Sequence, residues 1–509
     1  FSSLGGTIAD FNDDGRPDHF QTNAYEQVRL MFQSTDMSFN DTTTTNLPLN
    51  GENTEAAAIA DINNDGKMDV VNVNYLEEVP LSIYLHSTEE EGYPYFEETS
   101  DLLSASIATA NNKGVAVHDF DGDNLPEIIV SGYNSAEIYK NNGSAGFSNV
   151  TSSWAPDFSL IGKSNRIFIS DFNDDGYQDI FFPCGEEGWT GEQNRIMSWN
   201  EGSGQLEDQT SWLPLDVASS IDVDAADIND DGFPDILVAN QNQGSFLYLT
   251  QSPTTANPNY VLVDTFSMMS ATTVRYGDFN NDGLIDFVEG SGEKDIPLKV
   301  HLNTGEVDNP DYAEVYSLPN LSPILTGEVW DIEVYDLNND GYDDFITADF
   351  GVSQVFLSNG DGSFDDATST FFPDTSLLDE AWFTKSLTIA DVNEDGVIDI
   401  YFARDNQDLL LYGKGDPSGI IEFSLNSPSQ KMIIFPNPLV DQSTVRFENL
   451  PHEEYSLMVL NVQGEVVHHF QGLKKSEVTI RKGTMPRGQY FLVRTDKDGV
   501  TTTKKFIVK

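Results

Sequence analysis

A nine-residue acidic motif occurs eight times in this chain, and this repetition constrains the fold more than any other feature. The first copy is Asp10-Phe11-Asn12-Asp13-Asp14-Gly15-Arg16-Pro17-Asp18. Later copies start at Asp61, Asp119, Asp171, Asp227, Asp278, Asp336 and Asp391, at steps of 51 to 58 residues. Such a recurrence predicts a repeat protein in which each copy marks one structural unit.

Oxygen-bearing side chains occupy positions one, three, five and nine of every copy, although the third copy ends in Glu rather than Asp. Alternate side chains on a tight loop converge on one centre, and six to eight oxygen ligands suit Ca²⁺. Glycine at position six, replaced by Asn124 in the third copy, permits the positive φ of a sharp reversal. We therefore expect up to eight Ca²⁺ ions, one per repeat. The predicted ligands are Asp10, Asn12, Asp14, Asp18, Asp61, Asn63, Asp65, Asp69, Asp119, Asp121, Asp123, Glu127, Asp171, Asn173, Asp175, Asp179, Asp227, Asn229, Asp231, Asp235, Asp278, Asn280, Asp282, Asp286, Asp336, Asn338, Asp340, Asp344, Asp391, Asn393, Asp395 and Asp399.

Two other interpretations of the motif are weaker. An EF-hand needs Glu at position twelve and a helix on each side, but only Glu289 of the eight residues at that position fits. The flanking runs, such as 6–9 and 179–182, are apolar and typical of buried strands. A solvated turn would explain one copy but not eight with the same ligand positions. The pattern therefore predicts a metal loop that closes a β-hairpin.

Each repeat contains four strand-like segments, as at 166–170, 179–182, 195–199 and 205–210 in the fourth. Four-stranded units repeated around an axis form a β-propeller, in which each unit buries its apolar face against a neighbour. We expect an all-β, eight-bladed propeller. Because the last unit has its own fourth strand at 420–423, the ring should close without strand exchange between its ends. Seven blades and a leftover unit are the alternative.

The loops and the turn at 359–364 (Asn-Gly-Asp-Gly-Ser-Phe) resemble those of FG-GAP/VCBS repeats, the units of integrin α-subunit propellers and of many secreted bacterial proteins. The resemblance covers residues 6 to about 425. It implies that calcium loops lie on one face of the ring and that partners often bind elsewhere.

The tail differs in composition and charge. Alternating apolar segments with Gly or Pro turns follow residue 428 and predict a small Ig-like β-sandwich. We therefore divide the chain into residues 1–427 and 428–509. Pro436-Asn437-Pro438, Gly488-Gln489-Tyr490-Phe491 and the Lys509 end resemble the type A sorting domain of type IX secretion. The resemblance implies contact with the type IX secretion machinery and a secreted or outer-surface location in a Gram-negative bacterium. A generic adhesive sandwich is the alternative.

Charge restricts the partners of the chain. The first 430 residues hold 14 Lys and Arg against 76 Asp and Glu, whereas the remainder is slightly basic. An acidic surface disfavours nucleic acid and anionic membranes. No apolar run is long enough for a transmembrane helix, so we expect no membrane insertion.

The sequence contains no recognised catalytic motif, so whether the chain is an enzyme stays open, with catalysis the less favoured interpretation. We expect binding or adhesion to a glycan or protein partner, with Trp189 in a Gly-rich insert as the best surface candidate and Trp199 and Trp330 in the core. A calcium-dependent polysaccharide lyase or another carbohydrate-active enzyme is one alternative, and a surface-layer or filament component is another. A lyase would need a Brønsted base beside calcium. The available residues are Lys163, Arg195, Arg275 and Tyr276.

Overall fold

The computed structural model of the chain divides into two compact units, Phe1–Leu425 and Asn426–Lys509. The boundary expected after residue 427 falls within 426–431, outside the described residues. The structure describes residues 2–509 except 13, 15, 25–27, 34–38, 49–53, 75–80, 91–92, 100–102, 105–111, 134–135, 144–145, 186–190, 242, 252, 267, 269, 294–295, 306–309, 313, 319–327, 373–383, 392–397, 405–408, 416–420, 426–431, 436–438, 440–441, 448–454, 462–465, 475–476, 484 and 496–500.

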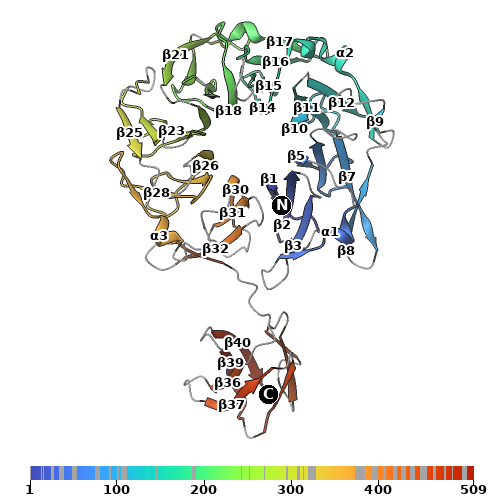
Figure 1. Cartoon of the computed structure of the whole chain (residues 1–509). Helices are drawn as coiled ribbons and strands as arrows, with labels where there is room; N and C mark the ends of the chain where they lie inside the picture. Colours follow the sequence, from blue (N-terminus) through green and yellow to red (C-terminus); the bar gives the residue numbers. More distant parts are fainter. Residues whose placement is uncertain are drawn as a thin grey trace. The chain divides into compact units, whose positions relative to one another are not determined.

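The described part of the first unit forms eight sheets arranged around a ring (Figure 1). Four antiparallel strands, consecutive in the chain, make up each sheet. The third sheet has in addition β9 (Leu103–Ser104), which pairs in parallel with its outermost strand. The all-β prediction is confirmed, and among the described strands no sheet combines strands from the two ends of the unit.

The first strand of each sheet lies nearest the centre of the ring, and the second follows it across an acidic loop (Figure 1). The first strands are β1 (Ser2–Ala9), β5 (Thr54–Ala60), β10 (Asn112–His118), β14 (Phe168–Ser170), β18 (Ser219–Ala226), β22 (Ala271–Gly277), β26 (Val329–Tyr335) and β30 (Thr384–Ala390). The second strands are β2 (Asp18–Ala24), β6 (Asp69–Asn74), β11 (Glu127–Gly132), β15 (Asp179–Phe182), β19 (Asp235–Gln241), β23 (Asp286–Ser291), β27 (Asp344–Asp349) and β31 (Asp399–Arg404).

The third and fourth strands lie farther out. The third strands are β3 (Arg29–Gln33), β7 (Leu81–Glu90), β12 (Ala136–Asn141), β16 (Arg195–Asn200), β20 (Ser245–Thr250), β24 (Leu298–Leu302), β28 (Val355–Ser358) and β32 (Leu409–Gly415). The fourth strands are β4 (Phe39–Asp41), β8 (Tyr93–Glu98), β13 (Phe147–Asn149), β17 (Gln205–Asp208), β21 (Tyr260–Phe266), β25 (Glu314–Leu318), β29 (Phe364–Asp366) and β33 (Ile421–Leu425).

Short helices connect some of the sheets: α1 (Thr43–Asn46), α2 (Thr151–Trp154), η3 (Pro156–Leu160), η4 (Thr210–Trp212) and α3 (Thr368–Phe371). Within the described part of the chain, no helix has the length and apolar character needed to cross a membrane.

Apolar side chains hold neighbouring sheets together. The second strands are buried on both faces, as in β6 and β11, because each lies between its own neighbours and the adjoining sheet. Seven buried clusters each join two successive sheets, from the first and second to the seventh and eighth. Each sheet therefore depends on its neighbours for burial of its apolar surface, as repeat architectures require.

The eighth sheet meets the first and closes the ring. Strand β30 contacts β1, and the His19 ring of β2 lies 3.8 Å from the Tyr401 ring of β31, between centroids. A cavity of about 530 Å³ lies inside the ring. Every sheet contributes to its wall, through its first strand or the residues leading into that strand.

The second unit contains two antiparallel sheets. One has the order β34 (Met432–Phe435), β35 (Gln442–Phe447) and β38 (Glu477–Arg481). The other has the order β37 (Val466–Leu473), β36 (Tyr455–Asn461), β39 (Gly488–Thr495) and β40 (Thr501–Val508). Val445 and Ile480 of the first sheet share a buried cluster with Leu457 and Leu492 of the second. The two sheets therefore pack face to face.

Candidate metal sites

Each acidic loop joins the first two strands of a sheet, and its ninth residue begins the second strand. Ala9 pairs with Asp18 across the first loop, and Ala226 pairs with Asp235 across the fifth. The same antiparallel register closes the other six loops. This pairing confirms the prediction that the motif closes a β-hairpin rather than joining two helices.

Backbone N–H groups orient the carboxylates within each loop. In the fifth loop, Asp231 N–H donates to Asp227 Oδ1 at 3.1 Å and to Asn229 Oδ1 at 3.0 Å. Gly232 N–H donates to Asp227 Oδ2 at 2.8 Å, and Phe233 N–H donates to Asp231 Oδ1 at 3.0 Å. The loops beginning at Asp61, Asp278 and Asp336 repeat these four bonds. The backbone of these loops thus holds the side chains of positions one, three and five in place.

Two residues adopt positive φ in each of the six loops that start at Asp61, Asp119, Asp171, Asp227, Asp278 and Asp336. Position six does so at Gly232 (88°) and also at Asn124 (65°), which confirms that Asn can replace Gly there. Position four does so as well, for example at Asp230 (56°) and Asn339 (56°). Asn, Asp and Gly are the residues that adopt this conformation most readily, so the second reversal explains their frequency at position four.

The position-nine carboxylate is the buried anchor of each loop. Asp235 is fully buried, and its Oδ2 accepts the Ile228 N–H of position two at 3.1 Å. Its Oδ1 accepts the Thr250 N–H of the third strand at 2.8 Å. The third-strand bond recurs at the carboxylates of Asp18, Asp69, Asp286, Asp344 and Asp399. The side chain at the start of the second strand therefore connects to both the beginning of the loop and the third strand.

Burial makes these anchors costly to ionise. It raises the pKa to about 7 at Asp18, Asp69, Glu127, Asp179, Asp235, Asp286 and Asp344. Neighbouring loop carboxylates raise the pKa further, whereas the backbone hydrogen bonds lower it. A cation held between the carboxylates would favour their charged forms. The donor set therefore fits a hard divalent cation.

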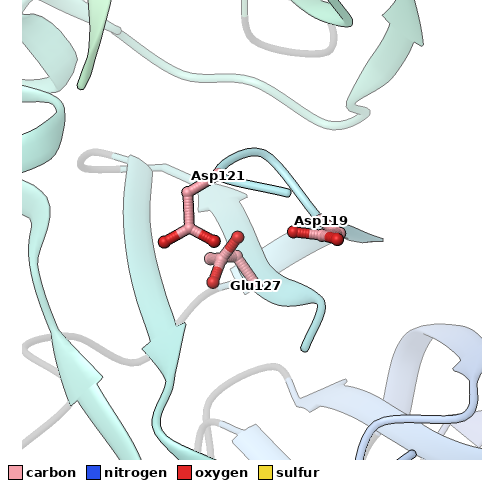
Figure 2. Close-up of side chains that lie close together, drawn as sticks. All are labelled: Asp119, Asp121 and Glu127. Atoms are coloured by element: carbon pink, nitrogen blue, oxygen red, sulfur yellow. The ribbon is translucent and has the colours of Figure 1, made fainter. Parts of the chain in front are cut away.

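The third loop brings three carboxylates closest together. Asp119, Asp121 and Glu127 offer oxygens that all lie within 4.8 Å of one another. Figure 2 shows Asp121 and Glu127 turned toward each other, with Asp119 beside them on the loop. Glu127 Oε2 accepts the Phe120 N–H at 3.0 Å, but its buried Oε1 accepts no hydrogen bond among the described residues.

A lysine reaches this same loop. Lys140 Nζ of β12 forms ion pairs with Asp121, with Asp123 Oδ2 at 2.9 Å and with Glu127 Oε1 at 3.7 Å. Its carbon chain and ammonium also lie against Trp154, whose ring centroid is 4.8 Å from Nζ. The third loop therefore contains a protein cation next to its candidate ligands. The motif gives no sign of this, because Lys140 is 13 residues beyond its last position.

Each described copy of the motif lies in its own loop between the first two strands of a sheet. Among the described residues, three carboxylates with oxygens within 4.8 Å of one another occur in the third loop alone. In the eighth copy, Asn393 and Asp395 lie outside the described residues, whereas Asp391 and Asp399 flank the gap. A second loop also contains a cation beside its ligands, because Arg16 pairs with Asp14 at position five of the first copy.

The candidate bases for catalysis are constrained by their surroundings. Burial lowers the pKa of Arg275, but Asp222 and Asp331, at 2.6 and 2.9 Å, outweigh it and raise that pKa above its usual range. Burial also raises the pKa of Tyr276 well above its usual value. Neither side chain is suited to accept a proton near neutral pH.

The tryptophans differ from expectation in one case. Trp199 is buried in the core as predicted. Trp330 is only half-buried and lines the central cavity, so its prediction as a core residue is wrong. Trp189, the surface candidate, lies outside the described residues.

Family comparisons agree with the repeat pattern and with the tail. FG-GAP-like repeats match residues 10–71, 119–182, 171–238, 227–289 and 336–426. The secretion system C-terminal sorting domain matches residues 433–509. A search of curated proteins finds no match.

Solved structures show the fold. The Dos1 propeller is 8% identical with a TM-score of 0.51, and the match covers 83% of this chain and 94% of that one. An Agrocybe aegerita lectin whose structure describes recognition of terminal N-acetylglucosamine is 14% identical, with a TM-score of 0.37 and coverages of 72% and 79%. The sorting domain indicates a secreted or cell-surface protein that contacts the secretion machinery. The chain belongs to the family of FG-GAP-like repeat proteins and ends in a type IX secretion sorting domain.

Proposed function

We propose that this chain is a calcium-stabilised, eight-bladed propeller that binds a glycan or protein partner at the outer surface of a Gram-negative bacterium. Positions one, three, five and nine of each loop would hold the ion, with a position-seven carbonyl as a further oxygen ligand. The bound ion would supply charge compensation for the buried position-nine carboxylate. The ion has a structural role in this proposal and no chemical one.

One observation carries the proposal: the same carboxylate arrangement recurs in the loops of successive sheets within a chain that has a sorting tail. Catalysis requires one distinctive constellation, whereas a fold-stabilising ion is useful in every repeat. Calcium sites of extracellular modules fill at concentrations of about 10⁻⁴ to 10⁻³ M. A secreted propeller would meet such concentrations.

The stabilisation available from such ions is large. With free calcium at ten times the Kd, one site adds about 1.4 kcal/mol to the free energy of unfolding. Eight independent sites would add about 11 kcal/mol, which is comparable to the whole net stability of an ordinary domain. Calcium would thereby keep the ring rigid enough to present a binding surface.

The test is a screen of the full chain against glycan and host-protein arrays, in calcium and in EGTA. Retention of a ligand in calcium and its loss in EGTA, without turnover, supports the proposal. Unsaturated products that absorb ultraviolet light would instead identify a lyase. Self-association seen by light scattering, without any array ligand, would identify a surface-layer component.

A further inference from the structure

A β-bulge recurs at one position of the inner strands. In β10, Asn112 pairs with Gly132 and Gly114 pairs with Ser131, so Lys113 is an extra residue between two successive pairs of the ladder. The same shift occurs in β1, β5, β18, β22, β26 and β30. In each case the extra residue lies six positions before the first Asp of the acidic loop.

Most of these bulges place their extra residue in the wall of the central cavity. A bulge twists its strand locally and changes the direction of a side chain. The six bulge residues that line the central cavity, the bulge ring, are Glu55, Lys113, Ile221, Thr272, Trp330 and Lys385. They lie near the starts of the inner strands, whereas the acidic loops follow the ends of those strands. The bulge ring and the metal loops therefore occupy opposite ends of the inner strands.

Cations concentrate around the bulge ring on an otherwise acidic propeller. Lys113, Lys385 and Arg166 line the cavity, and Lys163 joins them beside Tyr133. These four are among only 14 Lys and Arg in the first 430 residues. Glu55 is the one carboxylate of the bulge ring, and it pairs with Lys113 at 2.9 Å.

An ion network around a buried aspartate supports this end of the cavity. Asp222 is fully buried and pairs with both Arg166 and Arg275, and Arg275 also pairs with Asp331. These four residues come from the fourth, fifth, sixth and seventh sheets. The carboxylates of Asp222 and Asp331 therefore hold the two arginines in place next to the bulge ring.

Aromatic rings complete the lining. Trp330 of the bulge ring and Tyr133 are both half-buried in the cavity wall. Lys113 Nζ and Lys163 Nζ lie 5.8 and 5.6 Å from the centre of the Tyr133 ring. Rings with one apolar face and a polar edge suit the alternating CH and OH faces of a sugar. Cavities of about 300–1,000 Å³ are typical of small-ligand sites.

We propose that the bulge ring binds a sugar chain that carries carboxylate groups. Lys113 and Lys385 would bind the carboxylates through charge-assisted hydrogen bonds, and Trp330 would stack on a sugar ring. This inference rests on the proposed function as a surface binding protein and adds the ligand class and the site. The two aromatic rings in the cavity wall favour a sugar over an acidic peptide, and the acidic exterior disfavours nucleic acid.

The test uses the full chain in calcium and tetramers of galacturonic, glucuronic, mannuronic and guluronic acid, titrated by calorimetry. At least one tetramer should bind, and its methyl ester should bind about tenfold more weakly, because esterification removes the charge that strengthens the hydrogen bonds from lysine. The Lys113→Gln/Lys385→Gln double variant and the Trp330→Ala variant should each weaken binding by about tenfold or more.

Two variants serve as controls. Lys385→Arg retains the charge and should stay within about threefold of the unchanged chain. Lys299→Gln, on β24 outside the cavity lining, should leave the affinity unchanged. Circular dichroism and thermal melting show whether each variant folds.

Three results would overturn the inference. One is equal binding of an acid and its methyl ester, and another is stronger binding of tetraglutamate than of every uronate. The third is an array ligand that the bulge-ring variants bind as tightly as the unchanged chain does. That result would overturn this site but would leave the proposed function in place. The absence of any ligand on the arrays and among the tetramers would overturn both proposals.

Discussion

Lys140 Nζ lies 2.9 Å from Asp123 Oδ2, so the third acidic loop contains a lysine ammonium beside a candidate metal ligand. An ammonium there competes with a metal ion for the same oxygens. It also compensates their charge when no ion is bound. The third loop should therefore bind calcium more weakly than the fifth, whose described contacts include no cation.

Replacing this lysine should increase the calcium response. We expect Lys140→Met to lower stability in EGTA by about 0.5–1 kcal/mol, because the pair is partly exposed. In calcium the variant should equal or exceed the stability of the unchanged chain. Melting temperatures in EGTA and over a calcium series provide the measurement. Lys299→Met is the matched control, and an equal calcium response in both variants would contradict the competition.

Removing a buried anchor should affect one site. Asp235→Asn leaves either the Ile228 or the Thr250 N–H without an acceptor, which costs about 1–3 kcal/mol with or without calcium. In calcium the variant should lose about 1.4 kcal/mol more, the contribution of one site at ten times its Kd. Urea unfolding in calcium and in EGTA separates the cost of the lost hydrogen bond from the cost of the lost calcium site. The exposed Asp264, outside the loops, provides the control Asp264→Asn, and an equal loss under both conditions would argue against a metal at Asp235.

A buried carboxyl outside the loops should make stability depend on pH. Burial raises the pKa of Asp349 to about 8, although Thr347 Oγ1 donates a hydrogen bond to it at 2.8 Å. The unfolded chain loses this proton near pH 3.8. The folded state therefore binds more protons between these values, and its stability falls as pH rises from about 4 to about 8.

Asp349→Asn should remove that slope. In excess calcium, the variant should gain at least about 1 kcal/mol relative to the unchanged chain between pH 5 and pH 8, since one pKa unit corresponds to about 1.4 kcal/mol. The free energy of unfolding at several pH values is the measurement. A constant difference between the two proteins at all pH values would show that Asp349 does not titrate in this range.

The ion network of the cavity wall should be essential for stability. Asp222→Ala would remove the fully buried one of the two carboxylates that pair with the partly buried Arg275, which costs up to about 3–5 kcal/mol. The partly exposed pair of Arg195 and Asp208, at 3.5 Å, offers a comparison. Asp208→Ala should cost no more than about 1 kcal/mol in the same urea titration. Similar losses in the two variants would show that the network contributes no more than a surface pair.

The sequence predicts the repetitive features of this protein well. The spacing of the acidic loops, the glycine reversal and the hairpin register depend on neighbours within nine residues, and the pattern encodes them directly. The metal ligands stay a prediction. The apolar residue at position two, such as Phe11 or Ile228, is likewise buried as its periodicity indicates.

Features that depend on contacts between strands were not predictable in the same way. Lys140 contacts its loop from the third strand of the same sheet. Asp222 pairs with Arg275 of the next sheet, and the two residues are 53 positions apart in the sequence. The exposure of Trp330 depends on a bulge, which is a mismatch between two paired strands rather than a property of either alone. Local patterns carry no information about these three-dimensional relationships.

The last strand of the propeller also determines how the protein bears a load. Among the described strands, β33 pairs with β32 alone, and the chain continues from Leu425 into the tail. Tension on the tail would act first on the bond pair at Leu411 and Leu425 and then on each following pair in turn. When the tail is pulled, the hydrogen bonds between β32 and β33 would break one pair after another. This sequential separation needs a lower force than shearing two strands along their length, which loads all the bonds at once.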